Sequence, residues 1–276
     1  MPEMKLPFKY IIVFSILGLL FNRCTDNTNK NSEDIILSKN ELNKQINVQN
    51  FFNTVPASTL IFNLINETKL NYNPEYSNDP TKYKKYTLEK PRAFNLGIYG
   101  TDLAIAGAFN QAQESMLFLK CTNHLAQELG ISAAFDETIM NRLEKNKDNR
   151  DSTLEIISQS FKKADNLFCA NKRCELSILM ITGAFVEAMY VAGQYISSKQ
   201  NDTVAVNKLL TIYNQQTESL KYLINLLKIS SFEEDKKLVD KLSNIDQHLH
   251  NSNSIQNFQK AHQLMTELRQ EFVNVY

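Results

Sequence analysis

The chain has 276 residues, of which 43% are hydrophobic and 22% are charged, so it is long and apolar enough to bury one sizeable core. Lys and Arg together number 30, and Asp and Glu also number 30, which leaves a formal net charge of zero. A nucleic-acid-binding surface needs a clear basic excess, so this composition gives no reason to expect a nucleic-acid partner.

Residues 1–23 predict a signal peptide for export. Lys5 and Lys9 come before an uncharged, mainly apolar run over residues 11–21, which has the length of a signal-peptide core, roughly 7–15 residues. A membrane-spanning helix would need about 20 apolar residues. Cys24 follows shortly after the run, as the lipid-bearing cysteine does in the lipoprotein precursors that this leader resembles. Arg23 stands where such leaders usually carry a small residue, so an ordinary secreted protein and an uncleaved anchor are the alternatives.

The next part of the chain predicts a tether followed by a mixed segment. Residues 24–33 are polar and have no apolar periodicity, which is typical of a flexible tether. All six prolines lie at or before Pro91. Because proline in a helix interior costs about 3 kcal/mol, the proline-free remainder favours long helices. We expect one helix near residues 56–70 within a mixed segment over 34–90, and a helical bundle over 91–276.

Apolar residues recur at helical spacing along the predicted bundle. The members of the first stripe step by three and four residues, and they are Leu154, Ile157, Phe161, Ala164 and Phe168. Two later stripes, over 238–249 and 258–275, repeat the pattern. Such stripes are typical of amphipathic helices that pack on a core, so the predicted fold class is all-α.

Local signals predict where some of these helices begin and end. Ser152 with Glu155, and Ser231 with Glu234, have the spacing of a capping box at a helix start. Gly130 follows an apolar run that ends at residue 129 and fits a helix stop.

Two segments are apolar on every side, which predicts two buried central helices surrounded by amphipathic ones. Residues 93–119 carry only Asp102 and Glu114 as charges, and residues 176–196 carry only Glu187. The second segment is long enough to suggest a membrane span, but the charge near its middle argues against one. Five of the seven glycines lie in the two segments, namely Gly97, Gly100, Gly107, Gly183 and Gly193. Glycine destabilises a helix interior by roughly 0.5–1 kcal/mol, so we expect these small residues to let the two helices cross closely.

The acids of the central helices are the first candidates for a functional site. Asp102, Glu114 and Glu187, with Tyr99 as a donor on the first helix, could line a polar pocket that binds a small ligand. The alternative, which burial favours, is a polar core in which each carboxylate has a partner and the helix register is set. The sequence has no Glu-x-x-His pair, phosphate-binding glycine loop or Gly-x-Ser-x-Gly elbow, so it predicts no catalytic residue, metal site or cofactor.

Cys169 and Cys174 flank a short polar loop between two predicted helices. In an oxidising periplasm they could form a disulfide that closes this turn, and two free cysteines at helix ends are the alternative. Cys121 lies in the first apolar region and is expected to be a small buried hydrophobe.

The stretch over 93–120, AFNLGIYGTDLAIAGAFNQAQESMLFLK, is followed at 125–136 by LAQELGISAAFD. Together with the lipoprotein-type leader, this NLGIYGTDL-containing region resembles a family of uncharacterised predicted lipoproteins of the Bacteroidota type. The resemblance implies an exported lipoprotein with an all-α fold and brings no catalytic residues. Its most recognisable part makes Tyr99, Gly100 and Asp102 the first place to look for a functional spot.

The sequence therefore predicts a lipid-anchored helical protein of the bacterial cell envelope, at the outer membrane, with a binding or interaction role. Its expected partners are the membrane, through the lipid on Cys24, and an envelope protein or small ligand. The alternative function is a small-molecule-binding or enzymatic domain with a polar site between the two central helices.

Overall fold

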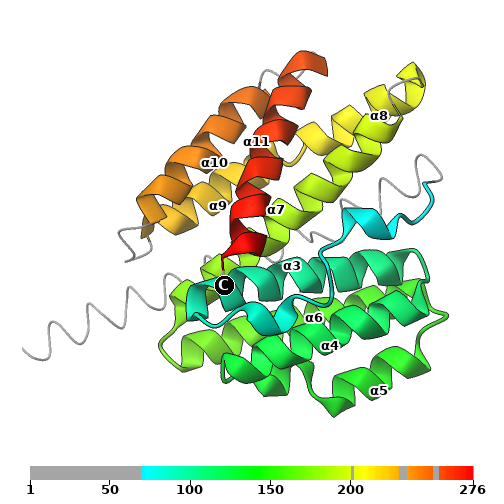
Figure 1. The fold of residues 1–276 in the computed structure, drawn as a ribbon, viewed down its shortest axis with the longest axis vertical. Helices are drawn as coiled ribbons and strands as arrows, with labels where there is room; N and C mark the ends of the chain where they lie inside the picture. Colours follow the sequence, from blue (N-terminus) through cyan, green and yellow to red (C-terminus); the bar gives the residue numbers. More distant parts are fainter. Residues whose placement is uncertain (1–69, 200–201, 230–234, 251–254, 276) are drawn as a thin grey trace, which may run out of the picture. The chain divides into compact units, whose positions relative to one another are not determined.

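The computed structural model describes residues 70–199, 202–229, 235–250 and 255–275 of the chain (Figure 1). The predicted leader, Cys24, the tether and the capping box at Ser231 lie outside these residues. The predicted helix near 56–70 also lies outside them, except for its last residue. Within the described ranges the chain forms helices and no strand, which confirms the all-α fold class.

Two short 3-10 helices, η1 (Pro74–Tyr76) and η2 (Tyr83–Lys85), lead into the first long helix. The helices that follow in chain order are α3 (Glu89–Ala108), α4 (Ala112–Glu128), η3 (Ser132–Phe135), α5 (Glu137–Lys145), α6 (Arg150–Ala170), α7 (Cys174–Ser198), α8 (Thr203–Asn214), α9 (Thr217–Ile229), α10 (Asp235–His250) and α11 (Ile255–Asn274). Since α3 begins at Glu89, it already includes the last two residues of the predicted mixed segment.

Helices α3 and α7 form the central contact of the bundle, as predicted. An added Cβ atom on Gly97 of α3 would lie 1.9 Å from the carbonyl oxygen of Met180 on α7. On Gly183 of α7 it would lie 2.0 Å from the carbonyl oxygen of Phe94 on α3. Each helix therefore presses its backbone against the other at a glycine, and no side chain fits between them.

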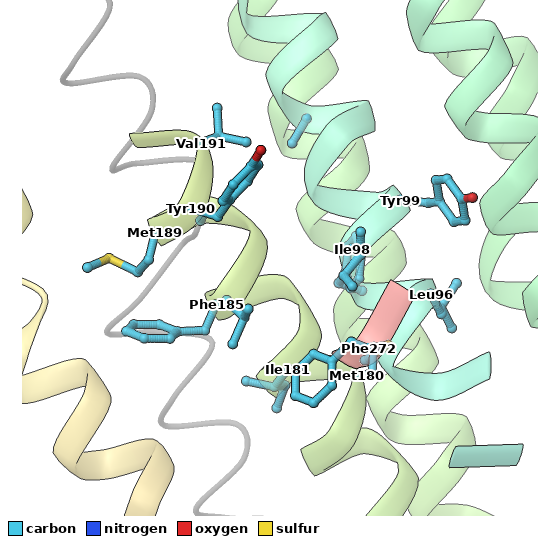
Figure 2. Close-up of a cluster of buried hydrophobic side chains, with 14 of the residues drawn as sticks. Leu96, Ile98, Tyr99, Met180, Ile181, Phe185, Met189, Tyr190, Val191 and Phe272 are labelled. Carbon is cyan, nitrogen blue, oxygen red and sulfur yellow. The ribbon is translucent and has the colours of Figure 1, made fainter. Parts of the chain in front are cut away.

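The other helices pack around this pair. Helices α4 and α6 contact α3, α6 also contacts α7, and α5 packs on α6. Helices α8, α9 and α11 contact α7, while α10 contacts both α9 and α11 (Figure 1). Figure 2 shows part of the resulting apolar core, with Leu96 and Ile98 from α3, Met180 and Ile181 from α7, and Phe272 from α11.

Helix α7 is the core helix that the sequence predicts. Of the helices in the described ranges, it alone is long and apolar enough to cross a membrane by those two criteria. Its most apolar window is 94% buried inside the bundle. The other helices cover its apolar surface on every side, which is the arrangement expected for a helix without a polar face.

The prediction of one helix over residues 93–119 is wrong, because the chain breaks there into α3 and α4. Asn110 adopts a left-handed conformation with φ 56°. Its backbone N–H donates to Gly107 O at 3.0 Å, and the N–H of Gln111 donates to Ala106 O at 2.8 Å. These two bonds make a Schellman motif, which ends α3. Hydrophobic periodicity does not detect such a stop, because it depends on one backbone conformation.

The start of α6 also differs from its prediction. The helix begins at Arg150, and its N-cap is Asn149, whose side chain accepts a hydrogen bond of 3.0 Å from the Ser152 N–H. Asn caps a helix as well as Ser does, so the earlier residue takes the role. The predicted helix stop at Gly130 is confirmed, since this residue has φ 73° and follows α4 and its C-cap.

Candidate functional site

A buried ion pair joins α7 to α11. Glu187 accepts two hydrogen bonds from Arg269, from Nε to Oε2 at 2.6 Å and from Nη2 to Oε1 at 2.8 Å. The side chain of Glu187 is fully buried and that of Arg269 is 7% exposed. The guanidinium group also lies over the ring of Tyr190, with 4.2 Å from Cζ to the ring centroid. The planar cation thus has a carboxylate in its plane and an aromatic face below it, which suits Arg and not Lys.

Asp102 brings a second carboxyl group from α3 into this cluster. It is fully buried, its Oδ2 accepts the backbone N–H of Asn78 at 3.0 Å, and its Oδ1 has no hydrogen-bond partner. Burial and then the nearby Glu187 raise the pKa of Asp102 well above its usual value, while Arg269 acts in the opposite direction.

The cluster is electrically balanced when Asp102 keeps its proton. Glu187 and Arg269 neutralise each other, so a second buried negative charge would lack a counter-ion. A protonated Asp102 can instead donate a hydrogen bond to Glu187, an interaction that also favours its neutral form. The arrangement connects three helices and faces no solvent, which is what a polar core that sets helix register requires.

The predicted polar pocket does not form as one site. The structure brings Asp102 and Glu187 together, pairs the hydroxyl of nearby Tyr99 with the backbone and leaves Glu114 elsewhere. Tyr99 is buried, its hydroxyl donates to Asp79 O at 2.7 Å, and its ring lies near Phe118 of α4. Figure 2 shows it on a different side of the core from Tyr190. Glu114 lies in the first turn of α4, because the break at Asn110 separates it from α3.

Glu114 lines a surface pocket of about 550 Å³ at the α3–α4 turn. The pocket has apolar side chains at Met116, Leu117 and Leu143 and charged ones at Glu114, Glu144 and Lys147. Met116 and Leu117 are 41% and 46% exposed, which is high for large apolar residues. The lining of the pocket therefore combines apolar side chains with charged ones, among which acids outnumber the base.

Cys169 and Cys174 are joined by a disulfide across the α6–α7 turn, with their Cα atoms 4.3 Å apart. Cys121 is a free, buried cysteine whose Sγ lies 3.6 Å from Pro80 O. Burial raises the pKa of the Cys121 thiol to about 12, so this thiol stays protonated and unreactive at neutral pH.

His262 is a residue that packs in the core. The ring of His262 lies parallel to that of Phe258 and rests against Gly193, where an added Cβ atom would come within 2.1 Å of Nδ1. Burial lowers its pKa to about 4, so the ring is neutral. Within the part of the chain that the structure describes, no group of three or more His, Cys, Asp or Glu residues is placed to hold a metal ion.

Sequence reasoning missed Arg269, the cation of the buried cluster. Arg269 follows Leu268 and lies four residues after Met265, both of which are buried. A charged residue so close to the apolar stripe of α11 is the signal that could have pointed to a buried partner, although it could not have named Glu187.

No family model, curated protein or solved structure matches the chain.

Proposed function

We propose that this chain is an exported helical lipoprotein of the bacterial cell envelope, held at the outer membrane by a lipid on Cys24, and that it binds a small ligand in the pocket at the α3–α4 turn. The leader, Cys24 and the polar tether support the first part. The observation that carries the second part is the pocket of about 550 Å³ with Met116 and Leu117 exposed in it.

The pocket has the size and chemistry of a ligand site. Small-molecule pockets usually have volumes of about 300–1,000 Å³ and combine an apolar lining with a few polar groups. Glu114 and Glu144 outnumber Lys147, so the ligand that fits best has an apolar body and a cationic group. The buried cluster of Asp102, Glu187 and Arg269 is a poorer candidate, since Glu187 and Arg269 pair with each other and all three residues are buried.

The lipid anchor is tested by incorporation of radiolabelled palmitate in growing cells. We expect label in the wild-type protein and none in Cys24→Ala, because the cysteine sulfur carries the lipid. Equal labelling of the two proteins would rule out attachment at this residue.

The pocket is tested with two probes of similar size and opposite charge, 3-phenylpropylamine and 4-phenylbutyrate. We expect the amine to bind saturably in ligand-observed NMR and the carboxylate to bind about fivefold more weakly, since a partly exposed ion pair contributes up to about 1 kcal/mol. Glu114→Gln should reduce this preference, and Leu117→Asn should weaken binding of both probes by removing apolar contact without changing the charge of the pocket.

Val204→Asn is the control, because Val204 is 70% exposed on α8 and is not among the residues that line the pocket. It should bind both probes as the wild type does. Equal binding by the wild type, Leu117→Asn and Val204→Asn would contradict the proposed site and leave the lipid anchor untouched.

A further inference from the structure

The α6–α7 turn is closed by its backbone as well as by its disulfide. The N–H of Arg173 donates to Phe168 O at 2.8 Å, and the N–H of Lys172 donates to Cys169 O at 3.0 Å. Lys172 has φ 58°, so this is a second Schellman motif at a residue other than glycine. The Arg173 side chain adds bonds to Leu129 O and Glu89. Backbone and side-chain hydrogen bonds therefore hold this turn together with the disulfide.

The two sulfurs of this bond differ in their surroundings. Cys169 lies in the last turn of α6 and is half-buried, whereas Cys174 is 1% exposed and is the first residue of α7. An external thiol can therefore approach Cys169 more easily than Cys174. A thiolate on Cys174 would lie at a helix N-terminus, where free N–H groups and the helix dipole stabilise negative charge and lower a thiol's pKa.

Asp165 lies beside the accessible sulfur, one helical turn before it. Its Oδ1 is 3.8 Å from Cys169 Sγ and accepts a hydrogen bond of 2.7 Å from the Ser177 hydroxyl of α7. The residue is 1% exposed. Burial raises its pKa to about 6, and the Ser177 bond acts in the opposite direction. The charged residues nearby along the chain, Lys172, Arg173 and Glu175, are not among the causes of this shift.

We propose that Cys169, Cys174 and Asp165 form a thiol–disulfide exchange site. Its co-substrate is an accessible disulfide of a small thiol compound, or the corresponding thiol in the reverse direction. Cys169 exchanges with the co-substrate, Cys174 is the resolving cysteine, and Asp165 accepts and returns the Cys169 proton. The site is independent of the pocket at the α3–α4 turn.

The reduced site reacts in two steps. Asp165 takes the proton of the Cys169 thiol, and the thiolate attacks one sulfur of the co-substrate, breaking its S–S bond and releasing one thiolate. The Cys174 thiol loses its proton to solvent and attacks Cys169 Sγ, which expels the second co-substrate thiolate and closes the Cys169–Cys174 bond. The released thiolates take up the two protons, so two cysteines are oxidised and one disulfide is reduced to two thiols.

The test uses the full-length protein, reduced with dithiothreitol, freed of it, and mixed with glutathione disulfide at pH 7. Samples quenched with acid and N-ethylmaleimide are followed by peptide mass spectrometry. We expect glutathione to appear on Cys169 and then to leave as the disulfide closes. Cys174→Ser should trap the mixed disulfide on Cys169, and Cys169→Ser should leave Cys174 unmodified on the same timescale.

Asp165→Asn tests the proton acceptor. We expect the first step to slow by about tenfold, less than the 100-fold or more of typical acid–base assistance because thiolates form readily. Ser177→Ala is the matched control that removes a neighbouring hydroxyl but keeps the carboxylate, and it should retain most of the rate. Far-UV circular dichroism establishes that each variant is folded.

Two results would overturn the proposal. One is modification of Cys174 by glutathione as fast as that of Cys169. The other is a folded Asp165→Asn protein that reacts at the wild-type rate.

Discussion

Arg269 determines how the buried polar cluster distributes its charge. It pairs with Glu187 through two hydrogen bonds and leaves no equivalent partner for Asp102 Oδ1. Burial without a counter-ion of its own raises the pKa of Asp102, which favours the neutral form of this second acid. The two carboxyl groups of the cluster thus differ in charge, with Glu187 as the anion that pairs with Arg269 and Asp102 as the acid whose neutral form is favoured.

This assignment predicts unequal effects of two conservative substitutions. Glu187→Gln removes the counter-ion of buried Arg269 and should lower the free energy of unfolding by about 3–5 kcal/mol. Asp102→Asn replaces a neutral acid by a neutral amide of nearly the same shape and should change it by less than about 1.5 kcal/mol. Urea unfolding at pH 7 measures both. Comparable losses in the two variants would mean that Asp102 is ionised in the folded protein.

At the scale of single helices, the α3–α7 contact depends on two glycines that meet backbone and not side chains. The atoms nearest to an added Cβ on Gly97 are Met180 O and Ala184 N, which cannot move without displacing α7. Gly107 differs, since its nearest neighbour is a methyl group of Thr153 at 2.8 Å. Two glycines of the same helix thus differ: Gly97 leaves no room for a Cβ atom, whereas Gly107 meets a side chain.

We therefore predict that Gly97→Ala destabilises the protein by about 3 kcal/mol or more, at or above the usual range for an overpacked core. Gly107→Ala should change stability by at most about 1 kcal/mol, because a gain in helix propensity of about the same size offsets the small clash. Thermal unfolding followed by circular dichroism compares the two. A mild effect of Gly97→Ala would show that α3 and α7 can separate slightly at no large cost.

The helix boundaries show which local signals can be trusted. Gly130 predicts a helix stop because glycine adopts positive φ freely. Asn110 and Lys172 end helices in the same positive-φ conformation, but neither Asn nor Lys is a reliable sequence signal for a helix end. The apolar pattern continues through Asn110, so periodicity joined α3 to α4 and put Glu114 on the wrong helix.

For the molecule as a whole, three buried groups make stability depend on pH in opposite directions. Asp102 and Asp165 have raised pKa values in the folded state, so each binds its proton more tightly when folded. Their contributions are fully present below the unfolded pKa and are lost as pH rises through the folded pKa. His262 has a lowered pKa of about 4, so its contribution to stability increases as pH rises from about 4 to 6.5.

We predict that Asp165→Asn removes one of the contributions to stability that decrease as pH rises. Relative to wild type, the free energy of unfolding of this variant should rise between about pH 4 and pH 6 by about 3 kcal/mol, since the pKa shifts from 3.8 to about 6 and one pKa unit corresponds to 1.36 kcal/mol. Urea unfolding at several pH values provides the curve. A difference that does not vary with pH would show that Asp165 titrates normally in the folded protein.

The sequence by itself determined the fold class, the apolar character of α7 and the close α3–α7 crossing, because these follow from residue periodicity and size along one helix. It also brought Asp102 and Glu187 forward as the rare acids of apolar segments. Only the tertiary structure decided that Arg269, 82 residues after Glu187, is the cation that pairs with Glu187. It also decided that Glu114 lines a surface pocket and does not join this cluster. Charge balance in a buried site depends on which helices meet, and that information is not contained in any local stretch of the chain.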